Sequence, residues 1–232
     1  MAPSTREVLS RGELEVRGRM PWSSNATFLV EARLEGVTVL GVYKPLRGER
    51  PLWDFPDGLY RREVAAYELS EALGWGIVPL TVARRDGPLG EGSVQEFVDA
   101  EPDQHYFTLY EDLRWHDQLR TICAFDLVAN STDRKSGHCL LGRDGRIWAI
   151  DNGLSFHVEF KLRTVIWEFG GEPVPPSLLA DIARIAESLP PSLADLLTTP
   201  ERAALRARAQ AVVRAGRFPV DRTGRRYPWP LV

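Results

Sequence analysis

Apolar and polar residues alternate along much of the first hundred residues, which is the pattern of strands that bury one face. Runs of this kind, separated by turns or by segments with Gly and Pro, cover residues 14–16, 28–32, 37–43, 80–83 and 93–98. Between the third and fourth runs, apolar residues recur with roughly helical spacing from Val64 to Leu73, and Gly74 or Gly76 ends that helix. Residues 1–98 therefore predict an antiparallel sheet of five strands with one helix.

The pattern becomes helical after a linker at residues 99–103. A long helix is expected at residues 110–130, followed by a hairpin at 139–150 that turns at Asp144 and Gly145. Further helices are expected at residues 176–188, 192–197 and 200–215. A β-rich part, 1–98, and a mainly helical part, 99–232, predict an α+β fold of two lobes with a cleft between them.

Composition and charge limit which classes of protein this chain can belong to. The chain has 232 residues, of which 44% are hydrophobic, so it can bury a full core. Its net charge of −3 provides no overall cationic field to attract nucleic acid. Two cysteines, Cys123 and Cys139, without pairwise spacing are typical of a reducing cytosol. The N-terminus lacks the apolar segment of a signal peptide, and no apolar run approaches the roughly 20 residues that span a bilayer. These features predict a cytoplasmic protein.

Arginine is concentrated in the last predicted helix and the tail that follows it. The residues are Arg202, Arg206, Arg208, Arg214, Arg217, Arg222, Arg225 and Arg226. The favoured interpretation is a solvated basic face. Contact with an anionic membrane surface or an acidic partner is the alternative, which the modest net charge does not support.

Lysine is rare among the cations of this chain. Of 29 Lys and Arg residues, three are lysine: Lys44, Lys135 and Lys161. Where arginine is the usual cation, a lysine points to a chemical need, because an ammonium is a compact charge that fits between phosphate oxygens. Lys44 lies in the segment V-Y-K-P, and Lys135 lies in T-D-R-K-S-G-H.

The segment T-D-R-K-S-G-H is followed shortly by I-D-N-G at residues 150–153. Asp133, His138 and Asp151 are thereby placed around a short strand-loop-strand unit. Two carboxylates and a nitrogen ligand from one such unit can hold Mg²⁺ and also contact a hydroxyl nucleophile. Phosphoryl transfer needs this layout, because the enzyme mostly positions groups and neutralises charge.

In these motifs and in the order of its elements, the chain resembles the protein-kinase-like superfamily. Within it, the likeness is to the phosphatidylinositol 3-/4-kinase and HipA-like branch, and most of all to a family of small actinobacterial proteins related to phosphatidylinositol kinases. The resemblance covers nearly the whole chain in element order, although only a few short motifs are specific. It implies ATP and Mg²⁺ or Mn²⁺ bound between two lobes, and transfer of the γ-phosphoryl group to a hydroxyl acceptor.

The resemblance also implies roles for individual residues. Lys44 grips the nucleotide phosphates and is oriented by Glu63, nineteen residues later. Asp133, in the place of the first residue of the lipid-kinase motif D-R-H-x-x-N, orients the acceptor hydroxyl and accepts its proton. Asp151 binds the metal together with His138. A serine-bearing phosphate loop and an inter-lobe hinge complete the nucleotide site: Ser23, Ser24, Asn25, Glu96 and Val98.

Departures from the family pattern bear on activity. The phosphate loop has no G-x-G-x-x-G. His138 stands where the family usually has Asn, and imidazole prefers softer divalent ions than an amide oxygen does, which favours Mn²⁺. Lys135 stands where lipid kinases have His, and it is a candidate to neutralise the transferring phosphoryl group. These departures keep open a second interpretation, a catalytically weak or inactive nucleotide-binding pseudokinase that acts as a regulatory module.

A third interpretation is a metal-dependent hydrolase, which leaves the lysine and the glutamate of the nucleotide site unexplained. Its ligands would be Asp133, His138, Asp151 and His157. For a kinase, the acceptor stays open among a protein, a lipid, a small metabolite and a nucleotide, because a fold does not determine a substrate.

Two polar residues, Asp126 and Asn130, lie one helical turn apart just before the loop that contains Asp133. The favoured interpretation is that they cap the end of the helix and hold Arg134. Direct participation in catalysis is the alternative.

Overall fold

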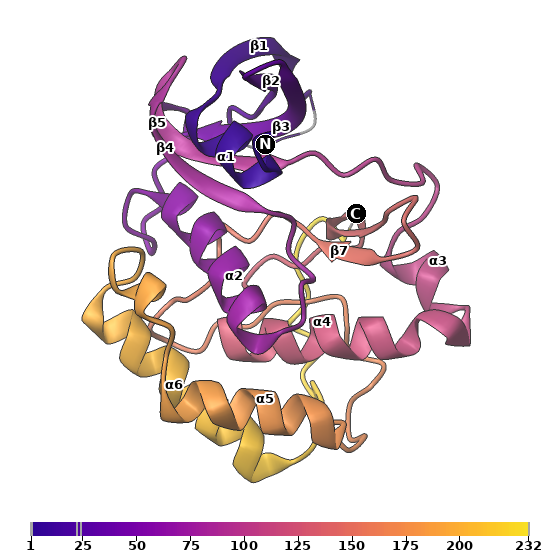
Figure 1. Ribbon diagram of the computed structural model, residues 1–232. Helices are drawn as coiled ribbons and strands as arrows, with labels where there is room; N and C mark the ends of the chain where they lie inside the picture. Colours follow the sequence, from indigo (N-terminus) through magenta and orange to yellow (C-terminus); the bar gives the residue numbers. More distant parts are fainter. Residues whose placement is uncertain (1, 22, 24, 232) are drawn as a thin grey trace.

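The N-terminal part of the computed structural model, which describes residues 2–21, 23 and 25–231, is an antiparallel five-stranded sheet in the order β1-β2-β3-β5-β4 (Figure 1). Its strands are β1 Glu13–Arg19, β2 Phe28–Leu34, β3 Val37–Pro45, β4 Thr81–Gly87 and β5 Gly90–Glu96. Glu35 and Gly36 make the tight turn between β2 and β3, both with positive φ, a conformation that glycine adopts without a steric penalty. The sheet predicted from the alternating pattern is confirmed.

A helix that the sequence pattern did not indicate, α1 (Thr5–Arg11), packs on this sheet. Its two buried residues, Val8 and Leu9, join the core of the sheet. Two apolar positions are too few to produce a helical period, which is why hydrophobic spacing missed it. The signal was in the polar residues, because Ser4 and Glu7 form a capping box at its N-terminus.

The predicted helix between the third and fourth strands is α2 (Leu59–Leu73), and it ends at Gly74, which has a left-handed φ of 77°. Its N-cap residue, Gly58, has no side chain to accept hydrogen bonds from the first turn. The Glu49 carboxylate does so instead, accepting from the backbone N–H groups of Gly58, Leu59 and Tyr60 at 2.8–2.9 Å. The Pro- and Gly-bearing connection before α2 is thereby joined to the start of the helix.

The helical part is divided more finely than expected. In place of one helix over residues 110–130, there are α3 (Tyr106–Tyr110), a 3₁₀ turn (Leu113–Trp115) and α4 (His116–Ala129). The Asp112 side chain accepts a hydrogen bond from the Arg114 backbone N–H at 3.0 Å, which favours a local turn over a continuous helix. The helix therefore begins at His116.

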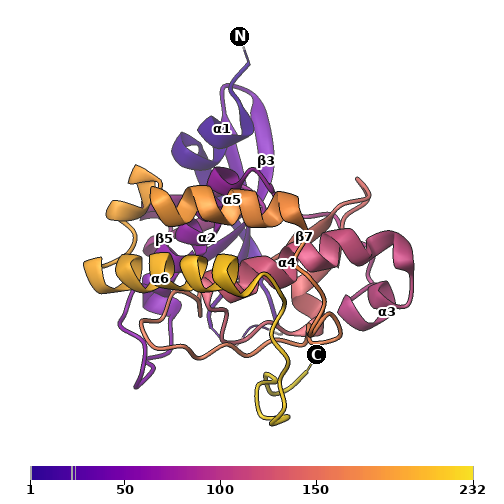
Figure 2. The same cartoon turned by 90° about the horizontal axis from the view of Figure 1, so that it is seen from below.

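The predicted hairpin is present as β6 (Cys139–Leu141) paired with β7 (Ile147–Ala149). The chain closes with α5 (Pro176–Glu187), a 3₁₀ turn (Pro191–Ala194) and α6 (Thr199–Ala215), in agreement with the expected helices. Figure 2 shows α5 and α6 side by side, with α4 behind them.

The larger of two apolar cores lies among the helices. It brings together Leu69 of α2, Ile122 of α4, Ile182 of α5 and Leu205 of α6. The smaller core lies between α1 and the sheet, and includes Val30 and Tyr43. Within the described residues, no helix is both long enough and apolar enough to cross a membrane.

Candidate active site

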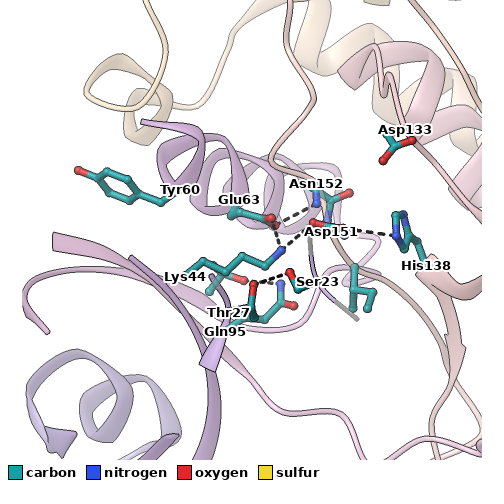
Figure 3. A network of polar contacts seen from close by, with 12 residues as sticks. Ser23, Thr27, Lys44, Tyr60, Glu63, Gln95, Asp133, His138, Asp151 and Asn152 are labelled. Carbon is teal, nitrogen blue, oxygen red and sulfur yellow. Dashed lines mark hydrogen bonds and ion pairs between the residues drawn. The ribbon is translucent and has the colours of Figure 1, made fainter. Parts of the chain in front are cut away.

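Three charged side chains from distant parts of the chain meet between the sheet and the helices (Figure 3). Lys44 extends from β3 and pairs with Glu63 of α2 and with Asp151, which follows β7. The Lys44 Nζ to Asp151 Oδ1 distance is 2.8 Å. Burial alone would lower the pKa of Lys44, yet the negative charges of Asp151 and Glu63 together raise it above its usual value. Lys44 is therefore a fixed ammonium at physiological pH.

Glu63 is held from two sides. One carboxylate oxygen pairs with Lys44, and the other accepts a hydrogen bond from the Asn152 backbone N–H at 3.0 Å. Gly153 lies so close that a Cβ there would be 3.2 Å from Glu63 Oε1. The glycine of I-D-N-G therefore permits the chain to pass next to the α2 carboxylate.

Asp151 is open to the cleft, with half of its side-chain surface exposed. The charge of Lys44 holds the pKa of Asp151 well below its usual value, so the side chain is an anion. His138 Nε2 lies 3.3 Å from Asp151 Oδ2 on the side away from Lys44. The other ring nitrogen, Nδ1, faces the Lys135 backbone N–H at 3.3 Å, which assigns the ring hydrogen to Nε2. In this tautomer Nε2 carries the ring hydrogen, and metal ligation through Nε2 requires the other tautomer.

Asp133 lines the same cavity as Asp151, and its side chain is 28% exposed. Burial, opposed by the charge of Lys135 with Nζ 3.5 Å from Asp133 Oδ2 and assisted by the charge of Asp151, raises the pKa of Asp133 to about 6. A carboxylate with a pKa near neutrality is suited to accept a proton and then release it.

If the chain transfers phosphoryl groups, as the sequence resemblance implies, this shift predicts a pH dependence of the transfer rate. A general base must be ionised, so the rate should fall as the pH drops through about 6 and level off above about 7. The measurement is the pH profile of kcat/KM for ATP turnover between pH 5 and 8. A profile that is flat over that range would show that Asp133 is not the group whose ionisation limits the reaction.

A buried arginine joins the segment that carries Asp133 to the segment that carries Asp151. Arg134 is fully buried and forms hydrogen bonds with both carboxylate oxygens of Asp126 on α4 at 2.9–3.2 Å. It also donates to Asn152 Oδ1 at 2.7 Å and to the Ile150 carbonyl at 2.6 Å. Arg134 follows Asp133 directly, whereas Ile150 and Asn152 flank Asp151, so one guanidinium fixes the segments that carry both aspartates.

Each of the two residues before the loop meets one part of the expectation: Asn130 is the C-cap that ends α4, and Asp126 holds Arg134. Asn130 also binds the segment after Asp151, donating to the His157 and Glu159 carbonyls and accepting from the Lys161 N–H at 2.7–3.0 Å. Its left-handed φ of 58° ends α4 and turns the side chain toward that segment.

Two neighbouring cavities, which share four lining residues, occupy the cleft. The larger, of about 330 Å³, is lined by apolar side chains such as Val42, Leu140 and Ile150, and by the predicted hinge residues Glu96 and Val98. The smaller, of about 50 Å³, lies toward α2 and its lining includes two residues the sequence did not single out, Glu49 and Tyr60. Both cavities are lined by Ser23, Thr27, Lys44 and Asp151. An apolar chamber that opens onto a charged one suits a nucleotide base followed by its phosphates.

The predicted phosphate loop is described in part. Ser23 lines both cavities, and its hydroxyl lies 2.7 Å from that of Thr27. Asn25 lines the smaller cavity, but its side-chain oxygen accepts a hydrogen bond from the Arg50 N–H at 3.0 Å. Ser24 lies outside the described residues. Thr27, which is buried next to Ser23, had no signal in the sequence beyond its place in the loop.

The hydrolase ligand set is not assembled around His157. Its Nδ1 accepts from the Glu159 N–H at 3.0 Å, so its Nε2 donates to the Asp54 carbonyl at 2.9 Å. Both ring nitrogens are therefore occupied by backbone groups. Among the described residues, no three His, Cys, Asp or Glu side chains gather to hold an ion by themselves. Mg²⁺ in phosphoryl-transfer sites is commonly bound by one or two carboxylates together with substrate phosphates, and Asp151 fits that arrangement.

Comparison with known proteins identifies relatives of the chain. No family model matches it. Protein Rv2133c of Mycobacterium tuberculosis is 39% identical over 265 residues, which cover 96% of this chain and 94% of that protein. This chain belongs to the family of Rv2133c.

Two solved structures share the fold of this Rv2133c relative. The proinflammatory kinase CtkA of Helicobacter pylori is 10% identical with a TM-score of 0.52, covering 90% of this chain and 94% of that one. The structure of hydra Fam20 with sugar is 14% identical with a TM-score of 0.50, covering 90% and 87%. At these identities the likeness concerns the fold alone, and it confirms a protein-kinase-like fold for this chain.

Proposed function

We propose that this chain is an ATP-dependent phosphotransferase of the phosphatidylinositol 3-/4-kinase-like type, which transfers a γ-phosphoryl group to a hydroxyl acceptor. The observation that carries the proposal is the meeting of Lys44 from the sheet with Glu63 and Asp151, next to an apolar chamber. A lysine that is oriented by one carboxylate can bind the phosphates, and a second, accessible carboxylate next to it can bind their cation. A kinase-like fold is consistent with this use.

In this proposal the adenine occupies the larger cavity beside Glu96 and Val98, and the triphosphate extends past Ser23 to Lys44. The predicted lobe boundary then follows Val98: residues 1–98 supply the phosphate grip, and residues 99–232 supply the loops with Asp133 and Asp151. The protein works in the cytoplasm, where ATP is available.

The transfer step uses Asp133. Its carboxylate accepts a hydrogen bond from the acceptor hydroxyl and takes the proton as the acceptor oxygen bonds to the γ-phosphorus. The bond from that phosphorus to the β–γ bridging oxygen breaks, and ADP leaves. Lys135, next to Asp133, neutralises charge on the moving phosphoryl group. Asp151 and His138 are the residues that would hold Mg²⁺ or Mn²⁺, which neutralises phosphate charge when bound.

The test compares two of the three lysines by the same substitution. Lys44→Met should weaken ATP binding by about tenfold or more, because a hydrogen bond to a charged group contributes about 1.5–3 kcal/mol, and should abolish ADP formation. Lys161→Met, which removes an ion pair with Asp54 outside the cleft, is the control and should bind ATP as the wild type does. Isothermal titration with ATP and MnCl₂ measures the binding, and ADP release measures turnover. Equal ATP affinity in the Lys44→Met variant and the wild type would refute the proposed site.

The second candidate is the pseudokinase. It is favoured by the phosphate loop without glycines and by the His138 tautomer, in which Nε2 carries the ring hydrogen and is not free to bind an ion. The same two measurements separate it from the kinase. Tight ATP binding by the wild type without ADP formation at any pH or with either metal would favour the regulatory module.

A further inference from the structure

The helix that carries Glu63 shares the core of the helical part of the molecule. The buried side chains of Ala65, Ala66, Leu69 and Leu73 belong to the same apolar cluster as residues of α4, α5 and α6. The core between α1 and the sheet includes no residue of α2 among those described. Figure 1 shows α2 below the sheet and next to these helices. The contact between Lys44 and Glu63 therefore joins a sheet residue to a helix that contacts β4 and β5 on one side and shares the core of the helical part on the other.

The residue before Glu63 makes a buried ion pair with the last helix. Arg62 is 4% exposed and pairs through Nη2 with Oε1 of Glu201, which is 5% exposed. The second oxygen of Glu201 accepts from the backbone N–H and the hydroxyl of Thr198 at 2.8 Å, so it caps the start of α6. The Arg62 guanidinium also lies over the Phe55 ring, 5.5 Å from its centroid. Arg62 Nε is buried without a hydrogen-bond partner among the described residues.

Adjacent helix residues point about 100° apart, so Arg62 and Glu63 face different neighbours. Arg62 reaches α6, and Glu63 reaches the cleft, where it contacts Lys44. A rotation or slide of α2 would disturb both contacts together. The far end of α2 is also attached to the helical part, because Arg184 of α5 donates to the Ala72 carbonyl at 2.6 Å.

We propose that Arg62 is a positioning residue, which through its ion pair with Glu201 fixes α2 and holds Glu63 in reach of Lys44 before nucleotide binds. This inference rests on the proposed function, because it assigns Arg62 a part in nucleotide binding. Burying two charges costs hydration energy, and the attraction between the charges offsets only part of that cost. A buried ion pair therefore contributes more to selecting one geometry than to stability. Such a pair next to a residue of the nucleotide site selects the geometry of that site.

The proposal predicts a particular kinetic signature. Without the ion pair, α2 samples arrangements in which Glu63 is away from Lys44. The apparent ATP affinity is then multiplied by the fraction of molecules in which Glu63 still contacts Lys44. Saturating ATP restores the competent arrangement. Arg62→Met should therefore raise the KM for ATP by about tenfold and leave kcat within about twofold of the wild type. A purely structural role would instead lower kcat in proportion to the folded protein lost, with KM unchanged.

The matched control is Arg61→Met, the same substitution on the neighbouring residue, whose side chain is exposed and contacts the Tyr60 ring. It should leave KM and kcat unchanged. Arg62→Lys keeps the charge and should give an intermediate KM. Hydrogen exchange of the backbone amides of residues 59–66, measured without ATP, should be faster in Arg62→Met than in the wild type and in Arg61→Met.

An unchanged KM with unchanged amide exchange in Arg62→Met would overturn the proposal, and so would a loss of kcat at constant KM. If the wild type neither binds nor turns over ATP, the proposed function fails. The exchange comparison alone then decides whether Arg62 fixes α2, and no difference from Arg61→Met would refute that as well.

Discussion

Asp133→Asn is expected to transfer phosphoryl groups about 10²–10⁴ times more slowly than the wild type, because it lacks the carboxylate that takes the acceptor proton in the proposed mechanism. Asp151→Asn should cause a loss of at least similar size, because the proposed cation site loses its carboxylate. Both variants should fold. Asp133 is partly exposed, and Asp151 has a left-handed φ of 57°, which asparagine also adopts readily.

The measurement is ADP release, or phosphate incorporation into the protein, with ATP and either Mg²⁺ or Mn²⁺. Thermal melting followed by circular dichroism checks the fold of each variant. Asp195→Asn, at an exposed aspartate in the helical part, is the matched control and should be as active as the wild type. Activity that survives both cleft substitutions would show that the assigned chemistry is wrong.

Arg134→Met is expected to have the largest effect on stability, lowering the free energy of unfolding by about 3–5 kcal/mol. The substitution leaves Asp126, a buried carboxylate, without its cation, and removes the hydrogen bonds to Asn152 and to the Ile150 carbonyl. Methionine fills much of the space of the arginine side chain. The expected loss of stability therefore comes mainly from the uncompensated charge of Asp126 and less from a cavity. Urea denaturation measures the change.

Arg85→Met is the control for this substitution, because Arg85 is exposed on β4, and surface changes of this kind usually stay within about 0.5 kcal/mol. A second variant, Asp126→Asn, removes the charge from the other partner and should also be strongly destabilised. If Arg134→Met unfolded at the same urea concentration as Arg85→Met, the buried network would not be what fixes the segments that carry Asp133 and Asp151.

Local patterns in the sequence predicted most of the elements. Strand alternation located the sheet, glycines located the end of α2, and apolar spacing located α5 and α6. α1 was missed because its information is in a capping box rather than in a hydrophobic period. The start of α4 was misplaced because the Asp112 turn depends on one side-chain hydrogen bond, which periodicity does not register.

The candidate site was predictable where a motif carried it. Lys44, Glu63 and Asp151 were placed together by resemblance, and the structure brings them into contact although 107 positions separate Lys44 from Asp151. No motif in the sequence indicated the pair of Arg62 and Glu201. They are 139 positions apart, and each is one of many charged residues, 29 cationic and 32 acidic, so nothing local distinguishes this pair from the others. A long-range pair without a motif is visible only once the fold is known.

The position of Lys44 between two carboxylates has a consequence for how ligands enter the cleft. In the proposed function, incoming phosphates would compete with Asp151 for the same ammonium, and the Asp151 oxygen released from Lys44 would become available to a divalent ion. The cation in turn screens phosphate charge that a single ammonium would otherwise face. Each ligand thus favours binding of the other. By thermodynamic linkage, the nucleotide raises the affinity for the cation by the same factor by which the cation raises the affinity for the nucleotide.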